Sequence, residues 1–263
     1  MTAMIELGDV SHSFTLADRE LKVLNDIDVT IDRGKFVSLI GASGCGKTTL
    51  LRTMAGLEYQ TEGTVLIDGS PARIGREDIA YVFQQDALWP WRTIEKCVTF
   101  PLQMRGVPKA ERTRRAHEVL ELVGLDQFSK SYPHQLSGGM RQRVNISRAL
   151  VGSPNVLLMD EPFGALDAQT REYLQLQLSR IVDEFQRTTM FVTHDIGEAI
   201  FLSDQVIVLS ARPGSIRDVI DIPFGRGRDL SLKRTPEFQE YVDRIWNLIA
   251  DDIQSAIVNE KAS

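Results

Sequence analysis

A glycine-rich segment followed by lysine and threonine is the part of the chain best suited to chemistry. It reads GASGCGKTT and comprises Gly41, Ala42, Ser43, Gly44, Cys45, Gly46, Lys47, Thr48 and Thr49. It fits the pattern G-x-x-x-x-G-K-[ST], in which backbone N–H groups at a helix N-terminus converge on phosphate oxygens. Lys47 would reach the β- and γ-phosphates, and Thr48 would offer its hydroxyl to Mg²⁺. A glycine-rich turn with only a structural role needs neither side chain, so we predict a nucleoside triphosphate site.

Two adjacent carboxylates follow an apolar run further along the chain. Residues 156–159 are apolar, and Asp160 and Glu161 come directly after them. Because a buried strand fixes the residue at its end, Asp160 is suited to hold a metal ion beside the phosphates. Glu161 points elsewhere, since it lies one residue further on, and is suited to act as general base toward an attacking water. Two acids at a strand end are weak support alone, but the upstream phosphate loop strengthens this interpretation.

Three other segments add to this pattern. LSGGM at residues 136–140 precedes a helix that we predict over 141–150. Ser137 and the amides of Gly138 and Gly139 would therefore form a second anion site near a helix N-terminus. Gln84 follows the strand-like YVF, and His194 follows the strand-like FVT.

In this order and spacing, the segments resemble the nucleotide-binding subunit of ATP-binding cassette (ABC) transporters. LSGGM is similar to the LSGGQ signature of that family, with Met140 in place of the usual Gln. We expect this change to affect packing, because the anion-binding Ser and Gly are kept. The resemblance implies an ATPase that uses ATP and Mg²⁺ and works as a homodimer. Two copies would stack head to tail, and the signature of each would cap the ATP of the other.

The resemblance also implies roles for single residues. Gln84 would sense the γ-phosphate and Mg²⁺, with the adjacent Gln85 as the alternative for that place. His194 would contact the γ-phosphate and orient Glu161. The predicted catalytic set is Glu161, His194 and Gln84, and the predicted metal ligands are Thr48, Gln84 and Asp160.

Two more residues match positions in the family. Asp167, in GALD, would lie in the loop that crosses the dimer interface, and Phe14, in SHSF, would stack on adenine. The nucleotide-binding set is thus completed by Phe14, Gln84, Ser137, Gly138, Gly139, Asp167 and His194.

A narrower resemblance concerns the transported solute. DALWPWRTI, SARPGSI and RDLSLKRTPEF are similar to segments of the nitrate, sulfonate and taurine import subgroup. This implies integral-membrane permease subunits as partners, a solute-binding protein as an indirect partner, and a place at the cytoplasmic face of the cell membrane. Leu88, Trp89, Pro90 and Trp91 either dock the permease or pack the chain's own helices.

The predicted elements alternate between strands and helices, which indicates an α/β fold with a mostly parallel sheet. Strands are predicted over residues 5–10, 23–31, 36–40, 65–67, 79–83, 156–159, 189–192 and 206–209. Helices are predicted over 47–56, 110–123, 141–150 and 168–185, with a short one near Ile196. The first two strands alternate apolar and polar residues, as half-buried antiparallel strands do. We therefore predict a phosphate-loop NTPase core with an antiparallel β subdomain and an inserted α-helical subdomain at about 86–150.

The domain prediction is an ATPase domain over residues 1–225 and a short helical extension over 226–263. Within the extension, the apolar residues of the last helix form one stripe at helical spacing: Phe238, Val242, Ile245, Trp246, Ile249 and Ile253. This stripe either packs on the chain's own body, which we favour, or docks a partner.

Composition limits the other possibilities. The 30 basic and 36 acidic residues give a net charge of −6, which argues against nucleic acid as a partner. No run of apolar residues is long enough to cross a membrane, and the acidic N-terminal segment lacks the pattern of a signal peptide. Cys45 and Cys97 have no paired spacing, so we expect two reduced thiols.

Rival classes explain less of the sequence. A phosphate-loop kinase or GTPase would leave LSGGM unexplained, and an inactive subunit would not need Lys47, Asp160, Glu161 and His194. A non-transport ABC ATPase would carry a long coiled coil or a second phosphate loop. An exporter remains an alternative because its ATP chemistry would be the same.

Overall fold

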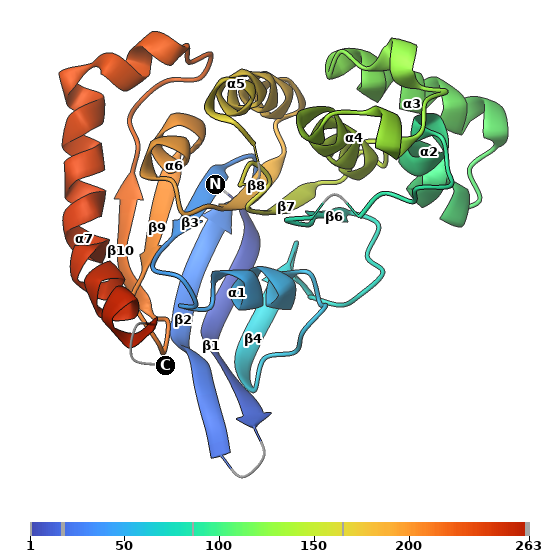
Figure 1. The fold of residues 1–263 in the computed structure, drawn as a ribbon. Coiled ribbons are helices and arrows are strands. Elements are labelled where there is room, and N and C mark those ends of the chain that lie inside the picture. Colours follow the sequence, from blue (N-terminus) through green and yellow to red (C-terminus); the bar gives the residue numbers. More distant parts are fainter. Residues whose placement is uncertain (1, 17–18, 86, 165, 261–263) are drawn as a thin grey trace.

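The computed structural model describes residues 2–16, 19–85, 87–164 and 166–260 (Figure 1). Its centre is a six-stranded sheet in the order β10-β9-β3-β8-β7-β6. These strands are β10 (Ile216–Asp221), β9 (Gln205–Leu209), β3 (Phe36–Ile40), β8 (Thr188–Val192), β7 (Val156–Asp160) and β6 (Ile79–Val82). All neighbours run parallel except β10, which pairs antiparallel with β9. The carboxyl ends of β3, β7 and β8 therefore meet at one edge of the sheet, where ligands bind in such folds.

Burial on both faces explains why the sequences of the central strands are apolar. Every residue of β3, β7 and β8 is buried. Leu157 and Met159 face one hydrophobic cluster, whereas Leu158 faces the other. A strand covered on both faces reads as a continuous apolar run, because neither side meets water.

A second, antiparallel sheet has the strand order β2-β1-β4-β5. It packs against helix α1 (Lys47–Met54), which lies between this sheet and the central one. It consists of β2 (Arg19–Asp32), β1 (Ala3–Leu16), β4 (Glu62–Ile67) and β5 (Ser70–Pro71). Leu50, Leu51 and Met54 of α1 are buried in the cluster shared by the two sheets. The helix that follows the phosphate loop is therefore held from both sides (Figure 1).

Three helices form the region to the right in Figure 1: α2 (Ile94–Met104), α3 (Lys109–Leu122) and α4 (Gly138–Leu150). Two short 3₁₀ helices, η1 (Asp126–Phe128) and η2 (Pro133–Gln135), connect α3 to α4. The described residues between 87 and 150 contain no strand. The predicted fold class, an α/β core with an antiparallel sheet and an inserted helical region, is confirmed.

The other face of the central sheet is covered by α5 (Ala168–Phe185) and α6 (Ile196–Leu202). The chain ends in η3 (Leu230–Arg234) and the long helix α7 (Pro236–Glu260), which lies along β9 and β10 (Figure 1). Phe238, Ile245 and Ile249 of α7 are buried in the main core, so this helix packs on the chain's own body. Trp246 was wrongly placed on the stripe, since it is 51% exposed. The side chain of Ile253 lies outside the described residues.

One helix boundary and one strand differ from the predictions in ways that matter. Helix α4 begins at Gly138, three residues before the predicted start, because Ser137 accepts a hydrogen bond from the N–H of Met140 and caps it. Strand β10 was not predicted at all. No helix among the described residues is both long and apolar enough to cross a bilayer.

Candidate functional site

A cavity of about 450 Å³ opens at the carboxyl edge of β3, β7 and β8. Its lining residues are Phe14, Leu21, Val23, Ser43, Gly44, Gly46, Lys47, Thr48, Thr49, Glu161, His194 and Arg212. Eight of the predicted nucleotide-binding residues, His194 among them, share this space with Glu161. This convergence comes from the sheet, because residues far apart in sequence follow neighbouring parallel strands.

The phosphate loop between β3 and α1 depends on its glycines. Gly46 precedes α1 with φ of 101°, and a Cβ there would lie 2.7 Å from a methyl carbon of Leu24. Gly44 also has a positive φ, of 72°. Lys47 is almost fully buried, and its Nζ donates to the carbonyl oxygens of Gly41 and Ala42 at 2.9 and 3.0 Å. The loop therefore presents its backbone N–H groups at the start of a helix, where they suit phosphate oxygens.

Asp160 is the last residue of β7 and contacts Thr48, another predicted metal ligand at this edge of the sheet. Its two oxygens accept hydrogen bonds from Thr48 Oγ1 at 2.9 Å and from Tyr81 Oη at 3.1 Å. Burial raises the pKa of Asp160, and the nearby Glu161 adds to this effect. Burial also raises the pKa of Tyr81, with Asp160 contributing further. Hard oxygen donors from a hydroxyl and a carboxylate are the ligands that Mg²⁺ takes beside a nucleotide, so the residues present fit this ion.

Glu161 is the meeting point of the predicted catalytic residues. Its Oε2 lies 3.1 Å from His194 Nδ1 and accepts a hydrogen bond from Gln84 Nε2 at 3.3 Å. The backbone of Glu161 has φ of 41°, which turns the chain sharply after β7, and its N–H donates to the carbonyl of Val192. A non-glycine residue in this left-handed region is strained, and such strain persists where the surrounding structure enforces it. The carboxylate of Glu161 is thereby directed away from that of Asp160, as predicted from their adjacency.

The signature segment lies at the start of α4 and is not part of the cavity lining. Ser137 and Gly138 are exposed at the start of α4, whereas Gly139 is buried, and a Cβ on Gly139 would lie 2.5 Å from a carbon of Thr170. Ser137, Gly138 and Gly139 are absent from the cavity lining. Met140 is partly buried and packs against the main core.

Asp167 is likewise not part of the cavity lining. It caps α5, because its Oδ1 accepts from the N–H of Thr170 at 3.0 Å, and this hydrogen bond lowers its pKa. Ser137, Gly138 and Asp167 are thus exposed and lie outside the cavity lining.

The two remaining predicted ligands differ in exposure. Phe14 lines the cavity, is 38% exposed, and makes an edge contact with His12 at 4.6 Å between ring centroids. Cys45 is buried beneath the loop, and burial raises the pKa of its thiol. Cys45 would therefore contribute to nucleotide binding through its backbone and not through its thiol.

Sequence reasoning missed several residues of the cavity. Leu21, Val23 and Arg212 line it, and Tyr81 holds Asp160. The Nε of Arg212 donates to the carbonyl of Gly44 at 2.6 Å. The segment SARPGSI that contains Arg212 was singled out as a resemblance, but nothing in its sequence placed it beside the phosphate loop.

The fold and the site together define a phosphate-loop ATPase. Comparison with known proteins agrees with this class, since residues 24–164 match the family described as ABC transporter. An uncharacterized ABC transporter ATP-binding protein of Methanocaldococcus jannaschii is 44% identical over 257 residues, which cover 98% of this chain and 95% of the relative. The nitrate import ATP-binding protein of Synechocystis sp. is 43% identical over 251 residues, covering 93% and 94% of the two chains.

A solved structure supports the same assignment. A dimeric ATP-binding cassette in a post-hydrolysis state, bound to ADP and Pi, has a TM-score of 0.75 and 33% identity, and it covers 84% of this chain and 100% of its own. The chain belongs to the ABC transporter family, as one of its ATP-binding, ATP-hydrolysing subunits.

Proposed function

We propose that this chain drives the uptake of a small solute such as nitrate, a sulfonate or taurine, by closing as a homodimer on two ATP molecules. Relatives named for the import of nitrate, aliphatic sulfonates and taurine, each 43% identical to this chain, support the solute class. The single observation that carries the two-copy mechanism is the position of LSGGM. Ser137 and Gly138 are exposed and lie outside the lining of the chain's own cavity, which supports a role toward a nucleotide held by another copy.

ATP would enter the cavity with adenine against Phe14 and its phosphates along the loop that precedes α1. Lys47 would then move from the carbonyls of Gly41 and Ala42 to the β- and γ-phosphates. Thr48, Asp160 and Gln84 would hold Mg²⁺, which neutralises charge on the phosphates when bound. These contacts position the γ-phosphate in front of Glu161 and His194.

Hydrolysis would use the groups already gathered at the end of β7. Glu161 accepts a proton from the water that attacks the γ-phosphate, and the P–O bond to ADP breaks as the new P–O bond forms. His194 and Gln84 hold the carboxylate of Glu161 from two sides. Ser137, Gly138, Gly139 and Asp167 of the second copy would close over the same ATP, and loss of Pi would let the dimer open.

A groove of about 420 Å³ between β6 and the helical region is where we place the membrane partner. Trp89 forms part of its wall and also contacts Phe100 and Arg92, so it both packs the helical region and borders the groove. Trp91, two residues further along the chain, is 72% exposed, whereas Leu88 is buried in the core and is no docking candidate. A permease docked here would keep the chain at the cytoplasmic face of the membrane.

Affinity purification of this chain from gently solubilised native membranes tests the proposal. We expect a multi-span membrane subunit to co-purify, together with a solute-binding protein that binds small oxyanions. Recovery of the chain alone, or with cytosolic machinery, would reject transport while leaving the ATPase intact. Co-purification of a permease whose system exports its solute would instead support the exporter alternative.

A further inference from the structure

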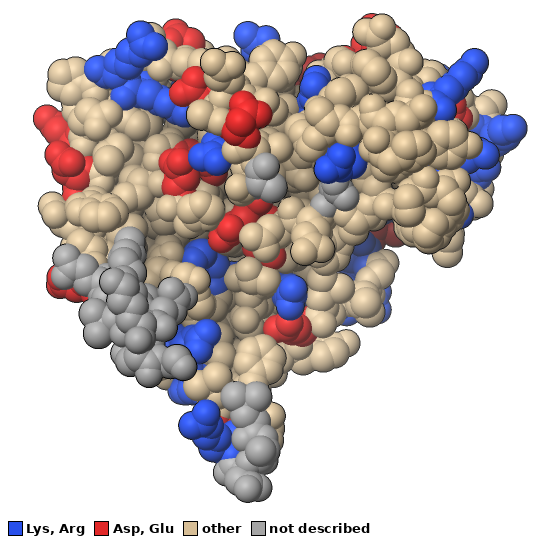
Figure 2. Space-filling model, viewed as in Figure 1, with Lys and Arg blue, Asp and Glu red and all other residues tan. Residues whose placement is uncertain are grey.

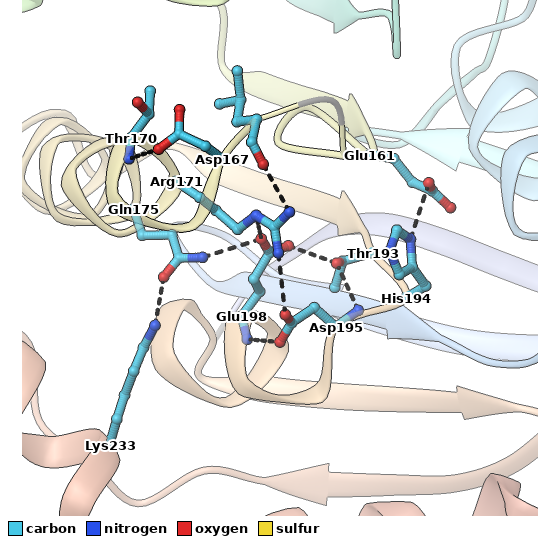
Figure 3. Close-up of polar contacts among 11 residues, drawn as sticks. Glu161, Asp167, Thr170, Arg171, Gln175, Thr193, His194, Asp195, Glu198 and Lys233 are labelled. Carbon is cyan, nitrogen blue, oxygen red and sulfur yellow. Dashed lines mark hydrogen bonds and ion pairs between the residues drawn. The ribbon is translucent and has the colours of Figure 1, made fainter. Parts of the chain in front are cut away.

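A row of hydrogen-bonded polar side chains begins at Thr193, the residue before His194. The mechanism above does not use this row. Figure 3 shows Thr193, Glu198, Gln175 and Lys233 joined end to end by hydrogen bonds. They come from four different parts of the chain: the residue before His194, helix α6, helix α5 and the 3₁₀ helix η3. The row thus connects the segment after residue 225 with the loop that carries His194.

The contacts in this row are short and buried. Lys233 Nζ donates to Gln175 Oε1 at 2.7 Å, and Gln175 Nε2 donates to Glu198 Oε1 at 3.1 Å. Thr193 Oγ1 donates to Glu198 Oε2 at 2.6 Å. Thr193, Gln175 and Glu198 are 2%, 1% and 5% exposed, so water does not compete for these bonds.

Thr193 connects these hydrogen bonds to the loop that carries His194. Its Oγ1 also accepts from the N–H of Asp195 at 3.0 Å, and Asp195 Oδ1 accepts from the N–H of Glu198 at 2.9 Å. The residues on both sides of His194 are therefore held by Glu198, directly or through Asp195. His194 itself is 62% exposed at the side chain, so its own surroundings do little to fix the ring.

Glu198 is costly to bury and is retained with partners on every side. Burial raises the pKa of its carboxyl, and the Asp195 charge acts in the same direction. Arg171 lies 3.7 Å from both Glu198 and Asp195, and it donates to the carbonyl of Leu166, in the loop before Asp167 (Figure 3). A buried polar network of this kind specifies one geometry, because any displacement leaves a polar group unsatisfied.

The cationic end of the row comes from the C-terminal segment. Lys233 is half-buried, lies 4.9 Å over the ring of Phe201, and has its pKa lowered by burial. Truncating its ammonium group would leave the buried Gln175 oxygen without its donor, and Gln175 would be free to rotate away from Glu198.

From these contacts we propose that Lys233, acting through Gln175, Glu198 and Thr193, positions His194 against Glu161 for ATP hydrolysis. The segment after residue 225 is then part of the hydrolytic apparatus, and Lys233 and Glu198 are positioning residues that touch no substrate. This inference rests on the proposed role of His194 in hydrolysis.

Steady-state ATPase measurements on the full chain are the first test. Lys233→Met should lower kcat about 10-fold, as loss of orientation does, while KM for ATP stays within about twofold. Lys233→Arg keeps a donor for Gln175 and should recover most of the turnover. The control is Lys130→Met, an exposed lysine on the helical region, which should behave as the unmodified protein. Unchanged kcat in Lys233→Met, or equal losses in Lys233→Met and Lys233→Arg together with a lower Tm, would overturn the proposal.

Nuclear magnetic resonance of the histidine rings gives a readout that needs no hydrolysis. The chain has only four histidines, His12, His117, His134 and His194, so ¹⁵N-labelled ring signals can be assigned with a His194→Gln variant. Lys233→Met should shift the His194 signals and leave those of His117 and His134 in place. A slowed enzyme with unshifted His194 signals would refute the positioning route. Normal turnover by His194→Gln would instead refute the role proposed for His194 itself, which is a separate failure.

Discussion

At the scale of single residues, the strained backbone of Glu161 sets the chemistry. Its φ of 41° directs the carboxylate toward His194 and Gln84, whereas Asp160 one residue earlier faces Thr48 and Tyr81. Two adjacent acids therefore contact different neighbours because the chain turns between them. In the proposed mechanism, Asp160 would hold the metal ion and Glu161 would accept the proton of the attacking water.

Replacing Glu161 with Gln should separate ATP binding from hydrolysis. Glutamine is isosteric and keeps the contacts to His194 and Gln84, but it cannot accept a proton. Turnover should fall by about 10² to 10⁴, the usual contribution of a general base. ATP binding should persist, and the ATP-bound dimer should last longer in size-exclusion chromatography. Near-normal phosphate release by Glu161→Gln would show that another group acts as the base.

The buried carboxyl of Glu198 predicts a pH effect on stability. Burial raises its pKa in the folded chain above the ordinary value of 4.5. Between these two pKa values, the folded state therefore binds a proton more strongly than the unfolded chain does. The contribution of this group to stability is therefore largest below 4.5 and declines as the pH rises through the raised pKa. Asp195 and Arg171 are the charged neighbours that face Glu198, and both are unchanged when Glu198 itself is replaced.

Glu198→Gln removes this titration and nearly keeps the shape. Its free energy of unfolding, relative to that of the unmodified protein, should therefore increase as the pH rises upward from about 4.5. Urea denaturation at a series of pH values measures this difference. A difference that stays constant from pH 4 to pH 8 would mean that the folded state does not raise the pKa of Glu198.

At the scale of elements, the turn between β9 and β10 supports the phosphate loop. Arg212 donates to the carbonyl of Gly44, and the N–H of Gly214 donates to the carbonyl of Val23. Helix α7 secures this turn in its place, because Asp252 accepts from the N–H of Ala211 at 2.9 Å. The far C-terminal helix is thus connected to the nucleotide cavity by two successive hydrogen bonds.

Removal of the Arg212 side chain should loosen the phosphate loop without unfolding it. We expect Arg212→Ala to raise the Kd for ATP about 3- to 10-fold, the equivalent of one ordinary net hydrogen bond. Titration with a fluorescent ATP analogue measures this change. Arg73→Ala, at an exposed arginine away from the cavity, is the matched control. An unaltered Kd in Arg212→Ala would mean that the loop holds its shape without this contact.

The sequence predicts these elements unevenly, for physical reasons. Strands such as β3 and β7 are recognisable because burial on both faces demands continuous apolar runs. Strand β10 reads IRDVID, with three charged residues at a sheet edge, and only its pairing with β9 makes it a strand. The same limit applies to Arg212, Tyr81 and Glu198, whose roles depend on neighbours that tertiary packing brings to them.

Helical spacing has a similar limit in α7. It identifies a stripe, but the direction in which the helix faces is decided by packing, which leaves Trp246 in solvent. The local motifs of the site were therefore predictable, and the groups that hold those motifs in place were not.

At the scale of the whole molecule, the proposed mechanism requires one copy to carry two incomplete sites. The phosphate loop with Glu161 lines one cavity, and the signature with Ser137 lies on an outward surface of the helical region. On the face shown in Figure 2, basic and acidic side chains are interspersed among the described residues. No broad field of one sign on this face opposes the approach of a second, identical chain.

Mixing two inactive variants tests whether the halves complete each other. Lys47→Ala loses its own phosphate loop but keeps an intact signature, whereas Ser137→Arg keeps the loop and blocks the signature. Each variant alone should hydrolyse almost no ATP. An equimolar mixture should form heterodimers in about half of the pairs, each with one intact composite site, because association of identical folds is statistical. Activity should then recover to about a quarter of the unmodified level if the two sites act independently.

The mixture also distinguishes this arrangement from its rivals. If the signature served the ATP of its own chain, no pairing could rescue either variant, and the mixture would stay inactive. Wild-type ATPase by Ser137→Arg alone would show that the signature takes no part in hydrolysis. Recovery that rises with the square of total protein concentration below the dimerisation Kd would identify the active species as two chains, since a pair must form before either ATP is cleaved.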